Sequence, residues 1–396
     1  MNILFVTAYD VSPQKGGTER VIHSLSNGLC ADFGVKCYLA YYDEIEKHYE
    51  RTSFNGKIRL VSGKQIKLLS DSLISWKIDV ILVEGLFNEV KRIRHLIEVQ
   101  HLFCKLIFVH HFSPGYEFHF YDFHRMLPRS RKWRDVMKSG MKIILYPCLR
   151  IYSKYEICRR YQNAYKYADR IVLLSRKHIS AFRKVGRINS ETKFSVIHNM
   201  LSYNEFFKIT DFHLKRREVI IVSRLEEEPK RISLALHVWY EIEKIPDLKD
   251  WILIIVGSGT SENYYFSLAR KLKLQRVVFK GVQEPLNYYR QASVFMMTSA
   301  SESWGLVLTE AQQMGVVPIA FDSYPTACDI IESGVNGYLI PDKDLDTYEC
   351  KLVELMRDEQ LRRMLAKNAI GNSKRFLSEI IIRDWNQLLA DVCNEA

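Results

Sequence analysis

The stretch that decides the fold is Ser301-Glu302-Ser303-Trp304-Gly305-Leu306-Val307-Leu308-Thr309-Glu310. It follows an apolar run, 293–297, that is typical of a buried strand, and apolar residues then recur at helical spacing over 306–314. We therefore expect a strand, a short loop and a helix whose first backbone N–H groups lie around Ser303, Gly305 and Leu306. Such a helix end binds anions, above all phosphates, and Gly305 lets a ligand approach the backbone closely.

Two carboxylates flank this anion site. Glu302 is expected in the loop before the helix, and Glu310 more than one turn inside it. A ligand with hydroxyl groups on both sides of a phosphate would suit this arrangement, and a nucleotide sugar is such a ligand. On spacing alone, the two acids are equally a solvated loop acid and a surface acid of an amphipathic helix.

The residues around the two glutamates carry a family resemblance. Seven residues separate Glu302 from Glu310, with Gly-Leu-Val between them and Ala-Gln-Gln-Met-Gly-Val-Val-Pro after them. This string resembles the signature of the retaining glycosyltransferases of family 4, which have the GT-B fold. By this resemblance Glu302 touches the transferred sugar and Glu310 holds the ribose hydroxyls. The donor-binding residues of the helix start would be Ser303, Trp304, Gly305 and Leu306.

The resemblance also implies the architecture. GT-B is an α/β fold in which two Rossmann-like, doubly wound parallel-sheet domains face a central cleft, and a C-terminal helix crosses back to the first domain. We expect an N-terminal acceptor domain over 1–205 and a C-terminal nucleotide-sugar donor domain over 206–374, with 375–396 packing back on the first. The polar, irregular stretch 201–215 is expected to be the linker between them.

Composition agrees with a two-domain soluble protein. The 396 residues exceed what one hydrophobic core usually serves, and 47% hydrophobic with 26% charged residues is ordinary for a globular chain. The eight cysteines are scattered without a C-x-x-C pair, so we expect reduced thiols and a cytoplasmic location. The start, 1–7, is typical of a strand and not of a signal peptide, and no apolar run is long enough to span a bilayer.

Strand-like and helix-like stretches alternate along both halves, which favours parallel, doubly wound sheets with ligands beyond the carboxyl ends of the strands. The expected strands are 2–8, 35–42, 57–61, 79–83, 105–109, 170–175, 194–199, 218–223, 251–256, 277–282 and 293–297, with 325–332 and 336–341 completing the second sheet. The expected helices are 18–32, 88–101, 306–314, 345–366 and 375–392.

The first strand is followed by a pair of glycines, Gly16 and Gly17, within Lys-Gly-Gly-Thr-Glu-Arg. Two glycines let the backbone come near a ligand, and Thr18 can cap the next helix. Alone, the pair is equally a flexible turn. Its similarity to the family string Gly-Gly-x-Glu-Arg-Val implies that it lines the cleft near the donor phosphates and the acceptor.

Two adjacent histidines, His110 and His111, end the expected strand 105–109. In the family a histidine at this place lies near the transferred sugar and the donor phosphate. The following Phe112 favours His111, while the register leaves His110 open. A histidine that simply caps the strand end is the alternative.

The second half begins with another strand and an Arg-Leu string. Arg224 comes just past this strand and Lys230 at the start of the next helix, so both would converge on one anion. The string resembles the family's Arg-Leu-x-x-x-Lys, which neutralises the donor pyrophosphate. Here one extra residue separates the two cations and Arg231 follows at once, so the lysine position is ambiguous between Lys230 and Arg231. Pairing with neighbouring glutamates is the alternative.

Two further strand ends complete the expected donor site. Gly257, in Val-Gly-Ser-Gly, resembles the family's Val-Gly-x-Gly, although alone it would be a weak phosphate-loop match. Backbone groups near Val282 would cradle the nucleobase, as the stretch after the preceding strand does in the family.

The segment 116–166 is both aromatic and basic. Between 125 and 166 stand twelve lysines and arginines and two acids, a balance of +10 out of a formal net charge of +11. Basic residues interleaved with aromatic ones suit an anionic membrane surface. We expect peripheral contact with the inner face of the cell membrane. Single-stranded nucleic acid and a merely solvated basic face are the alternatives, and no nucleic-acid motif accompanies the segment.

Loss of a nucleoside diphosphate leaves growing negative charge that the enzyme must stabilise. Metal-dependent transferases use a cation held by Asp-x-Asp. The string Asp344-Leu345-Asp346 lies at an expected helix start, where capping explains it. We therefore expect no metal and no cofactor. Arg224, Lys230 and the helix start would stabilise the leaving diphosphate in place of a metal ion.

The sequence thus predicts a retaining, metal-independent glycosyltransferase, hexosyl or N-acetylhexosaminyl in type, that acts on a glycan or polyprenyl-diphosphate-linked acceptor. A UDP-sugar is the favoured donor, and bacterial cell-surface polysaccharide synthesis is the expected setting. The open alternatives are a non-hydrolysing sugar-nucleotide epimerase and a non-catalytic protein that binds nucleotide sugars or nucleic acid.

Overall fold

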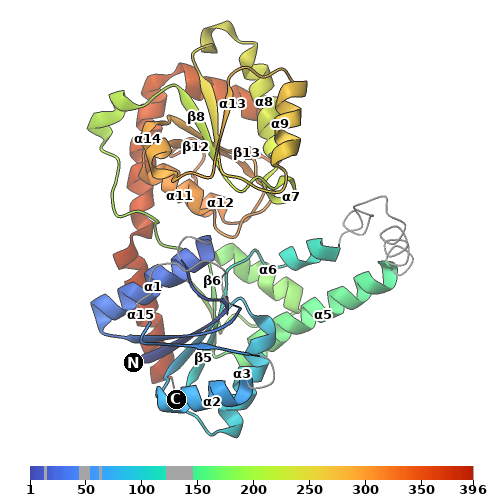
Figure 1. Ribbon diagram of the computed structural model, residues 1–396, viewed down its shortest axis with the longest axis vertical. Coiled ribbons are helices and arrows are strands. Elements are labelled where there is room, and N and C mark those ends of the chain that lie inside the picture. The colour runs from blue at the N-terminus through green and yellow to red at the C-terminus, as the bar shows by residue number, and fades with distance from the viewer. Residues whose placement is uncertain (13–15, 44–53, 62–64, 122–145, 396) are drawn as a thin grey trace. The chain divides into compact units, whose positions relative to one another are not determined.

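The computed structural model describes residues 1–12, 16–43, 54–61, 65–121 and 146–395. The chain forms two compact units (Figure 1): unit 1 is Met1–His198 with Ile381–Ala396, and unit 2 is Asn199–Ile380. From the sequence we placed the boundaries after 205 and 374, whereas the units divide after 198 and 380.

Unit 1 is built on a parallel sheet. Within the described residues it has seven strands in the order β3-β2-β1-β4-β5-β6-β7. These strands are β1 (Asn2–Tyr9), β2 (Lys36–Asp43), β3 (Gly56–Arg59), β4 (Val80–Glu84), β5 (Lys105–His110), β6 (Arg170–Leu173) and β7 (Phe194–Val196). The middle residues of the central strands are apolar and buried on both faces, as expected of a parallel sheet that helices cover on both sides.

Helices pack on the two faces of this sheet. Leu4 and Val6 of β1 face a core shared with α2 (Gln65–Ser75), α3 (Phe87–Val99), α5 (Tyr146–Tyr167) and α6 (Arg176–Gly186). Ile3 and Phe5 are equally buried on the opposite face. The remaining helices of the unit are α1 (Gly17–Phe33) and α15 (Ser378–Asn394), with the 3-10 helix η1 (Tyr116–Tyr121). Ile382 of α15 packs against Gly28 of α1.

Unit 2 repeats the plan. Its described residues form six parallel strands in the order β10-β9-β8-β11-β12-β13. These are β8 (Glu218–Val222), β9 (Ile252–Val256), β10 (Val277–Gly281), β11 (Val294–Met297), β12 (Val317–Asp322) and β13 (Tyr338–Pro341). The predicted α/β architecture of two Rossmann-like parallel-sheet domains is therefore confirmed.

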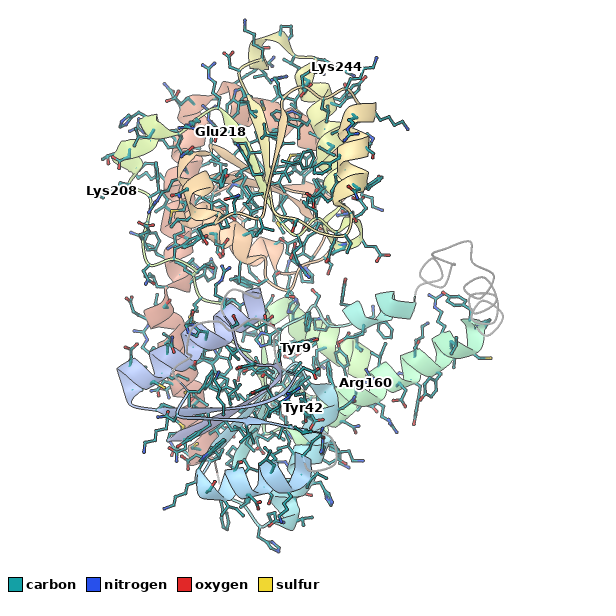
Figure 2. All side chains as sticks on the ribbon, viewed as in Figure 1. Tyr9, Tyr42, Arg160, Lys208, Glu218 and Lys244 are labelled. Atoms are coloured by element: carbon teal, nitrogen blue, oxygen red, sulfur yellow. The ribbon has the colours of Figure 1, made fainter. Side chains whose placement is uncertain are left out.

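The helices of unit 2 follow its strands. They are α7 (Glu227–Lys230), α8 (Ile232–Glu243), α9 (Glu262–Lys271), α10 (Leu286–Gln291), α11 (Leu306–Gln313), α12 (Ala327–Ile330), α13 (Leu345–Arg357) and α14 (Glu359–Ser373), with the 3-10 helices η3 (Ile209–Leu214), η4 (Pro246–Leu248) and η5 (Lys374–Phe376). Figure 2 shows the side chains of both units, with Glu218 labelled at the start of β8 and Lys244 just after α8.

Three sequence-based expectations about these elements are wrong. The single helix expected over 345–366 is two helices, because the extended backbone of Asp358 ends α13 and its carboxylate accepts a hydrogen bond from Leu361 N, starting α14. The stretch 201–215 is not a plain linker, since Phe212 lies in the core of unit 2. The stretch 325–332 contains helix α12, and β12 is the strand that was missed.

Candidate functional site in unit 2

The carboxyl ends of β8 and β11 lie side by side, because β8 pairs with both β9 and β11. From β8 the chain continues to β9 on one side, while β11 leads to β12 on the other. Ligands bind at such a reversal of strand order, beyond the carboxyl ends of the strands. Arg224 follows β8 and the loop 298–305 follows β11, so both lie at this position.

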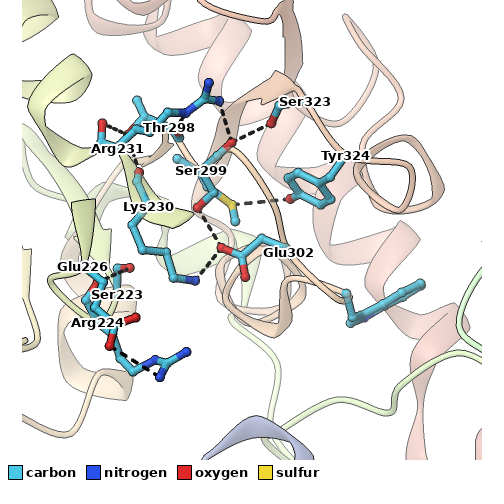
Figure 3. A network of polar contacts seen from close by, with 12 residues as sticks. Ser223, Arg224, Glu226, Lys230, Arg231, Thr298, Ser299, Glu302, Ser323 and Tyr324 are labelled. Carbon is cyan, nitrogen blue, oxygen red and sulfur yellow. Dashed lines mark hydrogen bonds and ion pairs between the residues drawn. The ribbon is translucent and has the colours of Figure 1, made fainter. Parts of the chain in front are cut away.

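Lys230 and Glu302 form an ion pair at this edge of the sheet (Figure 3). Lys230 Nζ lies 2.5 Å from Glu302 Oε1, and the same oxygen accepts a hydrogen bond of 2.7 Å from Ser299 Oγ. The two charged side chains are only 14% and 13% exposed. With Ser223 and Val307 they line a small cavity. The carboxylate is thus held in one orientation by two donors.

Arg231 has a structural role that distinguishes it from Lys230. Its guanidinium donates to the carbonyl oxygens of Thr298 and Ser299, at 3.0 and 2.9 Å, and pairs with Asp342. It therefore fixes the loop after β11 to the start of α8. The sequence left the lysine position ambiguous, and the structure places Lys230 beside Glu302 and Arg231 on the backbone.

Arg224 is the exposed cation of the site. Its side chain is 75% exposed, and Glu226 lies 3.7 Å from it. The backbone beside it is fixed to the loop after β9, because Leu225 N donates to Ser258 O and Ser261 N donates to Leu225 O. An exposed guanidinium on a fixed backbone is suited to bind an incoming anion.

Gly257 makes this loop packing possible. Its φ is +131°, and a Cβ there would lie 1.9 Å from Ser223 O. The sequence assigned this glycine to donor binding. Its structural role is to let the turn after β8 and the turn after β9 pack closely together.

Two residues that the sequence did not identify, Thr326 and Tyr324, lie beside the turn before α11. Gly305, with φ +89°, is the N-cap of α11, which begins at Leu306. Thr326 Oγ1 donates to the carbonyl oxygens of Ser303 and Trp304, at 3.4 and 3.3 Å. The Tyr324 hydroxyl lies 3.2 Å from where a Cβ of Gly305 would be.

Trp304 was predicted to contact the donor, but its indole ring belongs to the protein interior. The side chain is 1% exposed and packs edge-on against Phe376, with ring centroids 5.3 Å apart. Only the backbone of Trp304 is therefore left to meet a ligand.

Glu310 is buried and satisfied by protein hydroxyls. Oε1 accepts from Ser202 Oγ at 2.6 Å, and Oε2 accepts from Tyr289 OH at 3.1 Å. The predicted role, holding two ribose hydroxyls, has the same chemistry as these two contacts. Val282, by contrast, is 75% exposed and follows β10.

Unit 1 carries the remaining predicted residues. Gly16 caps α1 through backbone only, and Gly17 is the first helical residue. Thr18 lies inside the helix and does not cap it, so that expectation is wrong. A Cβ at Gly16 would lie 2.9 Å from Glu19 Oε2.

The two histidines have different surroundings. His110 is fully buried among aromatic rings, including Phe87, Phe108 and Phe182, and neither ring nitrogen has a hydrogen-bond partner among the described residues. His111 is 5% exposed, and its Nε2 lies 2.5 Å from Glu84 Oε2. Glu84, the last residue of β4, was not predicted. An imidazole enclosed by aromatic rings cannot touch a ligand, so His111 is the candidate.

His110 makes folding pH-dependent. Burial, with repulsion from His178 and His111, lowers its pKa to about 3. The unfolded chain, with a histidine pKa near 6.5, binds a proton in this window that the folded chain does not. The free energy of unfolding therefore decreases as the pH falls from 6.5 toward 3, by about 2.5 kcal/mol between pH 7 and 4.5.

We expect His110→Leu to remove this term. Urea unfolding should show that the free energy of unfolding of the variant, relative to that of the parent, is about 2.5 kcal/mol higher at pH 4.5 than at pH 7. His95→Leu, at an exposed histidine of α3, is the control. An equal change for both variants would contradict the burial argument.

The described residues contain no group of three or more histidines, cysteines, aspartates or glutamates arranged to hold a metal. Asp344 caps α13 by accepting from Thr347 N at 3.0 Å, which confirms the capping role predicted for its Asp-x-Asp string. That catalysis needs no metal stays a prediction. Within the described part of the chain, no helix is long and apolar enough to cross a membrane.

Comparison with known proteins finds relatives among glycosyltransferases. Residues 202–371 match the family model "Glycosyl transferases group 1". The chain is 27% identical over 230 residues, 57% of its length, to the amylovoran biosynthesis glycosyltransferase AmsD of Erwinia amylovora. It is 29% identical over 185 residues, 45% of its length, to the GtfA subunit of the UDP-N-acetylglucosamine–peptide N-acetylglucosaminyltransferase of Streptococcus pneumoniae. It spans 63% and 36% of these relatives.

Solved structures show the same fold. The lipopolysaccharide outer core galactosyltransferase WaaB superposes with a TM-score of 0.71 at 16% identity, covering 99% of both chains. Anabaena HepE in complex with UDP-glucose superposes with a TM-score of 0.71 at 18% identity, covering 99% of this chain and 100% of its own. At these identities the likeness concerns the fold alone.

Proposed function

We propose that this chain is a glycosyltransferase that moves a sugar, with retention of configuration and without a metal, from a nucleotide-diphosphate donor to a glycan or lipid-linked acceptor in bacterial cell-surface polysaccharide synthesis. The observation that carries the proposal is the Lys230–Glu302 pair, held beside Arg224 and the start of α11 at the switch point of unit 2. The match of residues 202–371 and the names of the relatives support it.

The departing diphosphate carries growing negative charge, so the site needs positive charge beside it. Arg224 offers an exposed guanidinium and Lys230 an ammonium group. The first N–H groups of α11, after Gly305, add the positive end of a helix. Together these groups can bind the departing diphosphate, whose oxygen then helps to deprotonate the acceptor hydroxyl on the same face.

Glu302 and His111 are assigned to the sugar. Glu302 orients the sugar because Lys230 and Ser299 hold its carboxylate in place. His111 supports the positive charge that develops at the reacting carbon. A UDP-sugar is the favoured donor because the HepE structure to which the fold is similar was solved with UDP-glucose.

Binding of UDP tests the donor site. UDP at 100 times its dissociation constant should stabilise the folded chain by about 2.7 kcal/mol, which a thermal-shift series of UDP, GDP and dTDP measures. Arg224→Ala should weaken UDP binding about 10- to 100-fold, the worth of one charged hydrogen bond, and leave uridine binding unchanged.

Arg217→Ala is the matched control, because Arg217 is also an exposed arginine but precedes β8 at the opposite end of the same strand. Equal losses in both variants, or no nucleotide stabilisation at all, would contradict the proposed donor site. Incubation with donor and acceptor then separates transfer from epimerisation of the donor and from binding without turnover.

We also propose a peripheral membrane contact through residues 150–159 of α5. Residues 122–145 of the predicted basic segment lie outside the described residues. Helix α5, which follows them, also combines exposed basic residues with exposed apolar and aromatic ones. Ile151, Tyr152 and Tyr155 are 71%, 64% and 63% exposed. Figure 2 labels Arg160 farther along this helix. Exposed cations lie among these apolar side chains: Arg150, Lys154 and Arg159.

Sedimentation with phosphatidylglycerol vesicles tests this contact. Replacing Arg150, Lys154 and Arg159 together by serine should weaken vesicle binding more than 100-fold, since each surface cation contributes about 1 kcal/mol. Ile66→Ser on α2, another exposed apolar side chain of unit 1, should leave binding unchanged. Tighter binding to a single-stranded oligonucleotide than to vesicles would contradict the membrane assignment.

A further inference from the structure

The Glu84–His111 pair lies where two neighbouring strands of unit 1 end. Glu84 is the last residue of β4, and His111 follows β5 directly. The two strands are in parallel register, with Glu84 opposite Val109. Gly85 N donates to Val109 O at 2.8 Å, so the chain remains attached to β5 beyond the end of β4. The backbone therefore fixes how far apart Glu84 and His111 are attached to the sheet.

The contact determines which imidazole nitrogen carries the proton. Glu84 Oε2 lies 2.5 Å from His111 Nε2, and the two side chains are 3% and 6% exposed. An ionised carboxylate only accepts hydrogen bonds, so Nε2 must be the donor. In the neutral ring the lone pair is then on Nδ1, and the ring plane is held by the carboxylate.

We propose that Glu84 is a positioning residue: it holds His111 in the Nε2–H tautomer, so that the neutral ring offers Nδ1 as an acceptor. The inference rests on the proposed function, in which His111 meets the donor sugar. It adds the chemical class of the group recognised there. An acceptor nitrogen binds a hydroxyl group of the sugar and not an unprotonated phosphate oxygen, which has no hydrogen to donate.

The same arrangement explains how His111 assists the reaction. As positive charge develops on the sugar, a neutral ring with a lone pair facing it is favourable, and the Glu84 carboxylate lies on the far side of the ring to polarise it. A histidine oriented by a carboxylate is a general device in enzymes. The alternative, a buried pair that only supports the fold, predicts the same contact but no dependence of the reaction on the tautomer.

The experiment is ¹⁵N NMR of the full chain labelled at histidine, with the His111 signals assigned by their absence in His111→Gln. The parent should show a protonated Nε2 and an unprotonated Nδ1. A proton on Nδ1 in the parent would overturn the proposal, whatever any variant does. This measurement needs no activity, so it stands even if no sugar transfer is found and the proposed function fails.

Glu84→Gln provides the second arm. Its amide can accept from Nε2–H or donate to Nε2, so we expect a mixture of tautomers, a 10- to 100-fold decrease in kcat with UDP-sugar, and unchanged binding of UDP, which lacks the sugar. Glu84→Asp, with a carboxylate one methylene shorter, should keep the parent tautomer. A Glu84→Gln chain with mixed tautomers and the parent kcat, measured at equal thermal stability, would reduce the pair to a structural contact.

Discussion

Glu302→Gln is expected to lower the rate of sugar transfer by about 10²- to 10³-fold, the usual cost of removing one preorganised electrostatic contact from a transition state. Glu302 Oε1 receives both Lys230 Nζ and Ser299 Oγ. Glutamine keeps the shape, and its amide oxygen can still accept these hydrogen bonds, but it removes the charge that pairs with Lys230. Initial rates with a radiolabelled donor measure the loss, and thermal unfolding reports whether the variant folds.

A double-mutant cycle that combines Glu302→Gln with Lys230→Met measures the coupling between the two residues, apart from the effect of each residue alone. If the two residues act as a unit, the double variant should be hardly slower than the slower single variant. Glu226→Gln is the matched control, because Glu226 is a half-buried acid beside Arg224 in the same region. Transfer at the parent rate by a folded Glu302→Gln protein would remove Glu302 from the site.

Gly257→Ala is expected to have the largest effect on stability, a loss of roughly 3 to 5 kcal/mol in the free energy of unfolding. The added Cβ would lie 1.9 Å from Ser223 O, a backbone atom that cannot rotate away. The φ of +131° is also a conformation that alanine rarely adopts. Because Arg224 follows Ser223, nucleotide binding should weaken as well. Urea unfolding and UDP titration measure the two effects.

Gly371→Ala is the opposite case in the same unit. Gly371 lies within α14, and a Cβ added there would have no neighbouring atom within 4 Å. Alanine at this position should stabilise the helix by about 0.5 to 1 kcal/mol. If both substitutions changed stability by similar amounts, the close approach of the turns after β8 and β9 would not be the reason for the glycine.

The strands were predictable because parallel strands that are buried on both faces contain continuous apolar runs, as in 80–83 and 106–109. Helix α2 was missed because its sequence is rich in serine, which weakens the helical pattern. Helices α13 and α14 were merged because apolar residues continue past Asp358, whose capping role depends on one backbone conformation. Propensity therefore located the elements better than their ends.

Site residues were predictable where they belong to one local string. The apolar runs predict the strands and therefore their ends, and next to these ends lie Glu302, Arg224 and Gly305. Glu84 was missed because its partner is 27 residues away, and Ser202 because it meets Glu310 from 108 residues away. Such pairings depend on strand order, which a single sequence does not specify. That the predicted residues bind a donor stays a prediction.

The packing of Ile382 against Gly28 has a consequence for the order of events during synthesis. Helix α1 leaves the ribosome before any part of unit 2, whereas its neighbour α15 ends after unit 2 is complete. Unit 2, which ends at Ile380, therefore has all its residues before unit 1 receives the rest of this helix. Domains usually mature in the order of translation. Here the later unit can finish first, and the earlier one must keep an apolar surface uncovered until α15 has been made.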